Sequence, residues 1–181
     1  KTLYDYNVNM LRTTTESMAA ILGGADTVCN LPYDSVYNEP NEFGERIARN
    51  QLLILKHESY FSEVYNPADG AYYIESLTKE LAESALQKFK EIESKGGFLK
   101  LLKEGSIQKE ITESARIEQQ KFDDEKIILV GTNAFQDFDN RIKDNLELNL
   151  LQEKKFGQTI IEPIVEKRIS SGLEQKRMGD E

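Results

Sequence analysis

The side chains best suited to bind a ligand are grouped in one short loop. They offer an amide, a phenol ring, a carboxylate and a hydroxyl, and belong to Asn30, Tyr33, Asp34 and Ser35. The loop directly follows a short apolar stretch, residues 25–30, which predicts a buried strand. Ligands of parallel α/β folds bind at the carboxyl ends of strands, so the loop is a candidate binding site. Asn, Pro, Asp and Ser are also the residues that turns favour, and a plain capped turn is the alternative.

A second turn in a similar position, residues 66–70, precedes a long predicted helix. Its backbone donors and the helix N-terminus could face an anion, although such turns are more often plain connections. The only histidine, His57, is expected late in a helix, where a solvated side chain is the usual outcome. The sequence contains no G-x-S-x-G motif and no phosphate-binding glycine loop. We therefore expect neither a catalytic residue nor a metal site on this chain.

Composition excludes several classes of partner. The chain has 181 residues, with 23 basic and 32 acidic side chains and a formal net charge of -9. This acidic balance argues against binding to nucleic acid, which needs clustered Lys and Arg. No apolar run approaches the roughly 18 residues that a membrane span requires, so no membrane partner is expected. The one cysteine, Cys29, cannot form an internal disulfide, and a reducing, cytoplasmic setting is expected.

Helices with apolar residues at three- and four-residue spacing are expected to position these loops. They are predicted at about residues 9–22, 41–60, 72–95, 98–104, 106–122 and 160–173. Short strands are predicted at residues 25–30, 64–65 and 126–130. Strands that alternate with helices form βα units, hence an α/β fold with a parallel sheet. Because a complete (β/α)8 barrel needs roughly 250 residues, the alternatives are a small α/β domain and a piece of a larger barrel.

Four strings of the sequence, taken in order, resemble the cobalamin-dependent acyl-CoA mutases, above all the methylmalonyl-CoA mutase family. They are RTTTESMAAILGGADTVCN, ERIARNQLLILKHES, NPADGAYYIESLTKELAESA and IILVGTNAF. The resemblance covers residues 1–135, which are similar to the C-terminal part of the family's CoA-binding barrel domain. Residues 136–181 look like a helical C-terminal extension. The resemblance implies an α/β fold: the C-terminal portion of a TIM-like (β/α)8 barrel, mostly helical with a few short parallel strands.

The resemblance also implies an activity. Residues 27–29 would be the seventh barrel strand and residues 72–95 the eighth helix. In the family, acyl-CoA threads the barrel axis and the corrin lies across the carboxyl ends of the strands. Homolysis of the cobalt–carbon bond of adenosylcobalamin starts a radical rearrangement that interconverts (R)-methylmalonyl-CoA and succinyl-CoA.

The candidate loop departs from the pattern of the family's catalytic chains. Of their His-Thr-Asn sequence after the seventh strand only Asn30 remains, and Ser35 stands where a Glu that helps to hold the adenosyl group is expected. Their glutamine-rich loop is replaced by residues 3–6, Leu-Tyr-Asp-Tyr, a pattern similar to the small, non-catalytic subunit of two-subunit mutases. The resemblance therefore implies that Asn30, Tyr33, Asp34 and Ser35 face the cofactor, but without the groups that grip its nucleoside.

The expected function is that of a small subunit that supports the catalytic large subunit of a heterodimeric mutase through packing contacts. Adenosylcobalamin and the acyl-CoA substrate would be bound by the holoenzyme, and not by this chain alone. The alternatives are the catalytic chain of a related mutase and a helical interaction module without CoA chemistry. Because a barrel fragment leaves a strand edge and inward-facing residues uncovered, the 181 residues alone are expected to self-associate or to be marginally stable.

Overall fold

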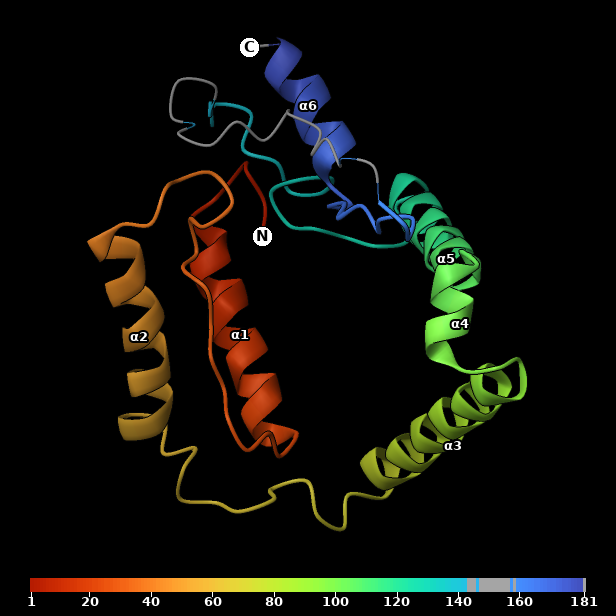
Figure 1. The fold of residues 1–181 in the computed structure, drawn as a ribbon. Coiled ribbons are helices and arrows are strands. Elements are labelled where there is room, and N and C mark those ends of the chain that lie inside the picture. The colour runs from red at the N-terminus through yellow and green to blue at the C-terminus, as the bar shows by residue number, and fades with distance from the viewer. Residues whose placement is uncertain (143–145, 147–156, 158, 181) are drawn as a thin grey trace. The chain divides into compact units, whose positions relative to one another are not determined.

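The computed structural model describes residues 1–142, 146, 157 and 159–180, and these contain six helices and no β-strand (Figure 1). The prediction of a mostly helical chain is confirmed. None of the described helices is long and apolar enough to cross a membrane. The helices are α1 (Val8–Leu22), α2 (Glu42–His57), α3 (Tyr72–Ser94), α4 (Phe98–Lys103), α5 (Ser106–Asp123) and α6 (Ser171–Asp180).

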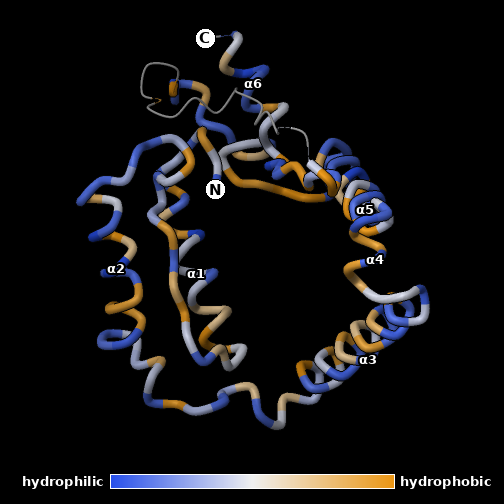
Figure 2. Tube along the Cα trace, in the orientation of Figure 1, coloured by the Kyte–Doolittle hydropathy of each residue, from blue (hydrophilic) through white to orange (hydrophobic). Residues whose placement is uncertain are grey.

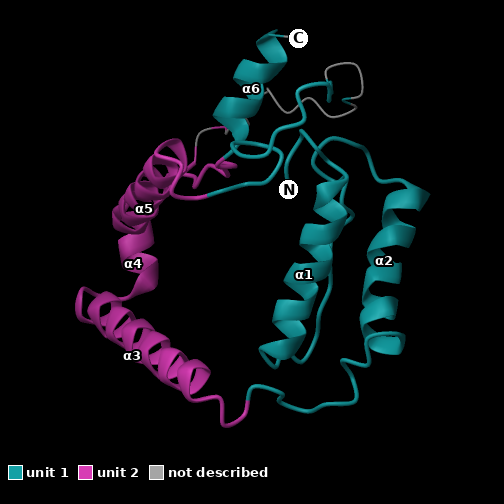
Figure 3. Ribbon diagram, turned by 180° about the vertical axis from the view of Figure 1, so that it is seen from behind, with its two compact units in different colours: residues 1–68, 128–153, 170–181 teal, residues 69–127, 154–169 magenta. Residues whose placement is uncertain are grey.

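The chain folds as two compact units (Figure 3). Unit 1 comprises residues 1–68, 128–153 and 170–181, and unit 2 comprises residues 69–127 and 154–169. Segments that are distant in the sequence therefore meet within each unit. Helix α6 belongs with α1 and α2, whereas the segment before α6 belongs with α3, α4 and α5.

In unit 1, α2 begins where Asn41 caps its first turn. The Oδ1 atom of Asn41 accepts the backbone N–H of Gly44 at 2.8 Å. Glu42 and Glu45 place negative charge at the helix N-terminus, where the helix dipole favours it. The helical spacing puts the buried residues on one face, which packs against α1: Gly44, Ala48, Gln51 and Leu55.

The buried face of α1 is polar. Asn9, Thr13 and Ser17 follow one another at four-residue spacing and are all buried. The hydroxyl of Thr13 donates to the carbonyl of Asn9 at 2.9 Å, and that of Ser17 donates to the carbonyl of Thr13 at 2.9 Å. Since buried polar groups need partners, Thr13 and Ser17 satisfy their hydroxyls on their own helix, and both present little bulk to their neighbours.

The segment between α1 and α2 runs back alongside α1, while the two helices point in the same direction (Figure 1). Its side chains alternate: Thr27, Cys29 and Leu31 are exposed, whereas Val28 and Asn30 are half-buried. Within the described chain, no group hydrogen-bonds to a backbone N–H or C=O of residues 26–31. The side chains of the segment thus alternate as in a strand that packs on helices with one face. Its backbone groups have no hydrogen-bond partner in the described part of the chain.

The strands predicted at residues 25–30, 64–65 and 126–130 are not formed among the described residues. A strand is defined by hydrogen bonds to a neighbouring strand, and these segments have no such neighbour in that part of the chain. Only an isolated parallel bridge joins Val130 to Ala134. The barrel therefore stays a prediction, although the alternation in residues 27–31 fits it.

The apolar core of unit 1 lies where the N-terminal segment meets α6. Its buried residues are Leu3, Tyr4, Tyr37, Ile142 and Met178. The backbone N–H of Leu3 donates to the Glu174 carboxylate on α6 at 2.9 Å. Segments that begin and end the printed sequence are therefore parts of one core.

The prediction of a helix at residues 160–173 is wrong, because residues 162–168 form no helix and α6 begins only at Ser171. In a helix the carbonyl of Glu162 would accept the N–H of the residue four positions later. Here it accepts the side-chain amide of Gln108 on α5 at 3.0 Å. Tertiary contacts therefore override the helical spacing of the isoleucines.

In unit 2, α3 is amphipathic but buries none of its residues. Its apolar stripe of Ile74, Leu77, Leu81 and Phe89 is exposed, and apolar positions recur along the helix in Figure 2. Lys88 of α3 and Glu110 of α5 form an ion pair at 2.5 Å. The apolar stripe of α3 is therefore left uncovered by the described residues of this unit.

Candidate functional site

The four predicted site residues lie at the end of the returning segment and in the turn that leads to α2. Tyr33 and Asp34 are buried, Asn30 is half-buried and Ser35 is exposed. The turn is closed by its own backbone, because the carbonyl of Asp34 accepts the N–H groups of Tyr37 at 3.0 Å and Asn38 at 2.9 Å.

Asp34 is held by two side-chain hydrogen bonds and lies close against α2. Its Oδ2 atom accepts the side-chain amide of Asn41 at 2.6 Å and that of Asn38 at 3.2 Å. Its Oδ1 atom lies 2.4 Å from the position that a Cβ on Gly44 would occupy. Only glycine leaves room for the carboxylate at this point of α2. The buried Asp34 therefore ties the loop to the cap of α2.

Tyr33 belongs to a cluster of aromatic side chains. The ring centroids of Tyr6 and Tyr37 lie 5.1 Å apart, and Tyr33 meets Phe43 edge to face at 6.4 Å. Burial, the nearby Asp34 carboxylate and the neighbouring phenols raise the pKa of both Tyr33 and Tyr37 above 10, and Tyr37 rises further. The two phenols hydrogen-bond to each other, which favours the proton on Tyr37 and opposes part of the rise in the pKa of Tyr33. Both rings are therefore neutral parts of the fold.

Asn30 is fixed by a glutamine that the sequence does not single out. Its side-chain amide donates to Gln51 Oε1 at 3.1 Å. The amide of Gln51 donates in turn to the carbonyl of Met10 at 2.5 Å and to the hydroxyl of Thr14 at 3.0 Å. Gln51 thus joins the returning segment to both helices. Its spacing of four residues from the apolar Leu55 is the sequence signal that could have placed it on the buried face of α2.

Arg12 is a second organising residue that sequence reasoning missed. Its Nη1 atom donates to Thr2 Oγ1 and to Asn9 Oδ1, both at 2.8 Å, and its Nη2 atom donates to the carbonyl of Val130. Burial lowers the pKa of Arg12, and the nearby carboxylates of Asp5 and Glu16 partly oppose this shift. The guanidinium therefore joins α1, the N-terminal segment and the stretch before Gly131.

The other candidates show no ligand-binding arrangement. The turn at residues 66–70 directs the N–H of Gly70 to the carboxylate of Glu75 in the first turn of α3, at 2.8 Å. An acidic side chain of the protein thus already occupies the place considered for an anion. His57 and Cys29 are exposed. Among the described residues, no three His, Cys, Asp or Glu side chains are grouped as metal ligands.

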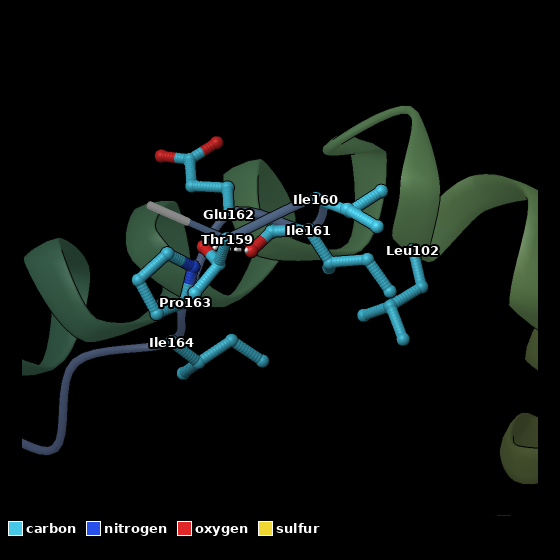
Figure 4. A pocket seen from close by; sticks show the side chains of 7 residues that line it. All are labelled: Leu102, Thr159, Ile160, Ile161, Glu162, Pro163 and Ile164. Carbon is cyan, nitrogen blue, oxygen red and sulfur yellow. Dashed lines mark hydrogen bonds between the residues drawn. The ribbon is translucent and has the colours of Figure 1, made fainter. Parts of the chain in front are cut away.

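Unit 2 has an open pocket of its own (Figure 4). It is lined by Leu102 of α4 and by residues 159–164, most of them apolar. The hydroxyl of Thr159 bonds to the carbonyl of Ile161 at 2.7 Å, so this polar group is used within the segment. None of the four predicted site residues lines this pocket.

Three of the four predicted side chains of the loop are engaged within the fold. The polar groups of Asp34 and Tyr33 are buried and bonded within the fold, and the amide of Asn30 is bonded to Gln51. Ser35 is the one exposed side chain of the four. Turning the other three toward a ligand would break the contacts that build the loop, and each buried polar group left unpaired costs about 1–3 kcal/mol.

Known proteins have sequences similar to that of this chain. The profile of the methylmalonyl-CoA mutase family matches residues 1–176. The methylmalonyl-CoA mutase small subunit of Porphyromonas gingivalis is 38% identical over 181 residues, which are 100% of this chain and 29% of that protein. The small subunit of Streptomyces virginiae is 47% identical over 100 residues, which are 55% of this chain and 16% of that protein. The methylmalonyl-CoA mutase of Rhizobium meliloti is 37% identical over 159 residues, which are 85% of this chain and 22% of that protein.

The chain belongs to the methylmalonyl-CoA mutase family. It spans less than a third of the length of the relatives described above.

Proposed function

We propose that this chain is part of the small, non-catalytic subunit of a heterodimeric methylmalonyl-CoA mutase, which interconverts (R)-methylmalonyl-CoA and succinyl-CoA. The observation that carries the proposal is the 38% identity, along the whole chain, to a protein named as that small subunit. Residues 1–135 are proposed to be the last part of the barrel domain, and residues 136–181 its helical extension. The single, exposed Cys29 supports a cytoplasmic location.

The returning segment supports the barrel part of the proposal. The backbone groups of residues 26–31 have no hydrogen-bond partner among the described residues, and exposed side chains alternate with half-buried ones in residues 27–31. In a barrel, a strand of this kind is covered by helices on its outer face and pairs with a strand at each edge. The exposed Thr27, Cys29 and Leu31 would then face the barrel interior, while Val28 and Asn30 face α1 and α2. A purely helical interaction module would not need an extended segment of this kind. The alternative function as such a module is therefore not favoured.

The candidate loop supports a non-catalytic role. Asn30, Tyr33, Asp34 and Ser35 are proposed to be the part of this chain nearest to the cofactor, but three of the four hold the loop together. Adenosylcobalamin, which supplies the radical chemistry when bound, would therefore be held by the catalytic large subunit. This chain would stabilise that subunit through packing contacts.

A reconstitution experiment tests the proposed function. The full-length polypeptide is purified alone, and also together with the large subunit. Equilibrium dialysis then measures adenosylcobalamin binding, and succinyl-CoA formation measures turnover. We expect binding and turnover only in the complex. Turnover by the isolated polypeptide would favour the catalytic alternative, and a large subunit that is fully active and stable alone would remove the supporting role.

Replacement of Ser35, the exposed side chain of the loop, tests whether the loop contacts the cofactor directly. In the complex, Ser35→Ala is expected to change the affinity for adenosylcobalamin less than about twofold, because surface changes away from a binding contact are nearly neutral. A loss of about tenfold, equal to about 1.4 kcal/mol, would instead place this loop in direct contact with the cofactor.

A further inference from the structure

Helix α6 is docked on the N-terminal segment by specific polar contacts. The Glu174 carboxylate, 1% exposed, accepts the backbone N–H of Leu3 at 2.9 Å. Leu3 and Tyr4 share one apolar cluster with Met178 of α6. A buried carboxylate that holds a backbone amide fixes position far more narrowly than apolar contact alone, since it loses its partner if the helix shifts.

Arg177 adds a second attachment on the same helix. Its guanidinium lies over the ring of Tyr4, 4.0 Å from the centroid. Its Nη2 atom also donates to the carbonyl of Asn140 at 3.0 Å and to that of Asp137. The side-chain oxygen of Asn140 in turn accepts the N–H of Asp5 at 3.3 Å. Both α6 and the stretch before residue 143 therefore hold residues 3–5.

The contacts continue from the N-terminal segment to the candidate loop. Next to Leu3, the N–H of Thr2 donates to Asn9 Oδ1 at 3.0 Å, and Asn9 Nδ2 donates back to the Thr2 carbonyl at 2.8 Å. The same amide group of Asn9 donates to the carbonyl of Tyr33 at 3.2 Å. Tyr37, which is bonded to Tyr33, belongs to the apolar cluster that includes Met178. Hydrogen bonds and packing thus both connect α6 to the turn after Tyr33.

We propose that α6 is a strap that sets the conformation of the turn at residues 33–38 through the N-terminal segment. Glu174 and Arg177 attach the helix to the N-terminal segment. When α6 is docked, residues 2–5 are fixed, Asn9 is oriented and the carbonyl of Tyr33 is held. When α6 is released, the turn loses these restraints although α6 does not touch the Tyr33 carbonyl itself. This proposal does not depend on the mutase assignment.

Amide hydrogen exchange on the full-length polypeptide tests the strap. The turn provides its own reporters, because the N–H groups of Ser35, Tyr37 and Asn38 are hydrogen-bonded and exchange slowly when the turn is closed. Glu174→Ala is expected to accelerate exchange about tenfold in residues 2–6 and in residues 33–38. Glu174→Gln, which keeps an acceptor oxygen, should restore most of the protection at both places.

Lys176→Ala is the control, because Lys176 is exposed on the same helix. It should leave both segments unchanged. The proposal is overturned if Glu174→Ala accelerates only residues 2–6, since α6 would then be a local cover. It is equally overturned if exchange accelerates as much at residues 52–57 of α2, which would indicate a general loss of stability, or if Lys176→Ala has the same effect.

Discussion

Asn41 and Asp34 are joined by a 2.6 Å hydrogen bond between a side-chain amide and a buried carboxylate. Asn41 also caps α2 through its Oδ1 atom, so one side chain connects the helix start to the candidate loop. The carboxylate therefore has a structural task, and the loop cannot bind a ligand through Asp34 without loosening the first turn of α2.

Replacement of Asp34 tests this structural task. Asp34→Ala removes the acceptor of the Asn38 amide and the shorter of the two hydrogen bonds that the Asn41 amide donates. We expect the free energy of unfolding to fall by about 2–3 kcal/mol. Urea unfolding followed by circular dichroism measures the change. Ser35→Ala, at the exposed neighbouring position, should stay within about 0.5 kcal/mol of the parent. Equal effects of the two variants would contradict the anchoring role.

Glycine is required at position 131 by the positive φ of the backbone and by the close approach of Asp5. Its φ is +78°, and a Cβ there would lie 2.5 Å from the Cβ of Asp5. Gly24 has a similar φ of +80° but nothing within 4 Å, which makes it a matched control. Gly24→Ala should cost about 1 kcal/mol through backbone strain, and Gly131→Ala about 3 kcal/mol because the clash is added. Denaturant unfolding compares the two, and a smaller cost at Gly131 would show that Asp5 can move aside.

The phenol cluster predicts a loss of stability in alkali. The pKa values of Tyr33 and Tyr37 are raised in the folded chain, mainly by burial, so the unfolded chain loses these protons first as the pH rises. The stabilisation is complete below about pH 10 and is lost progressively above it. Unfolding measured between about pH 8 and pH 11 should show this decline, and Tyr37→Phe should flatten it. Tyr65→Phe, at a residue that is 99% exposed, should leave the decline unchanged.

The uncovered stripe of α3 predicts association of the 181-residue chain. Leu81 is 63% exposed within a row of apolar residues, and such patches favour contact between copies. Sedimentation velocity should reveal oligomers whose fraction rises with concentration. Leu81→Glu should reduce that fraction, whereas Ser76→Glu, which adds the same charge outside the apolar stripe, should not. A sharp monomeric boundary for the parent chain would refute the prediction.

Most helices could be predicted because their signals are local. The spacing of apolar residues and the terminal glycines predict a helix at residues 72–95, and the structure has α3 at Tyr72–Ser94. The cap at Asn41 likewise lies within one turn of the helix that it starts. These features need no knowledge of the rest of the fold.

The contacts that decide the role of the loop could not be predicted in this way. Leu3 and Glu174 are 171 positions apart, and no local pattern pairs them. The same holds for the hydrogen bond that the side-chain amide of Gln108 donates to the carbonyl of Glu162. The spacing of the isoleucines predicted a helix there, in which that carbonyl would have bonded to the backbone. Asp34 and Ser35 are adjacent in the sequence, yet only the packing makes one a buried anchor and leaves the other in solvent.

The alternation of Thr27, Val28 and Cys29 has a consequence for assembly. Any neighbouring strand that pairs with this segment must do so in one register, because a slip of one residue would turn Cys29 toward the helices and Val28 away from them. The helices on either side already select one face of the segment. If a strand is added at this segment, the packing of residues 27–31 on the helices therefore fixes its register.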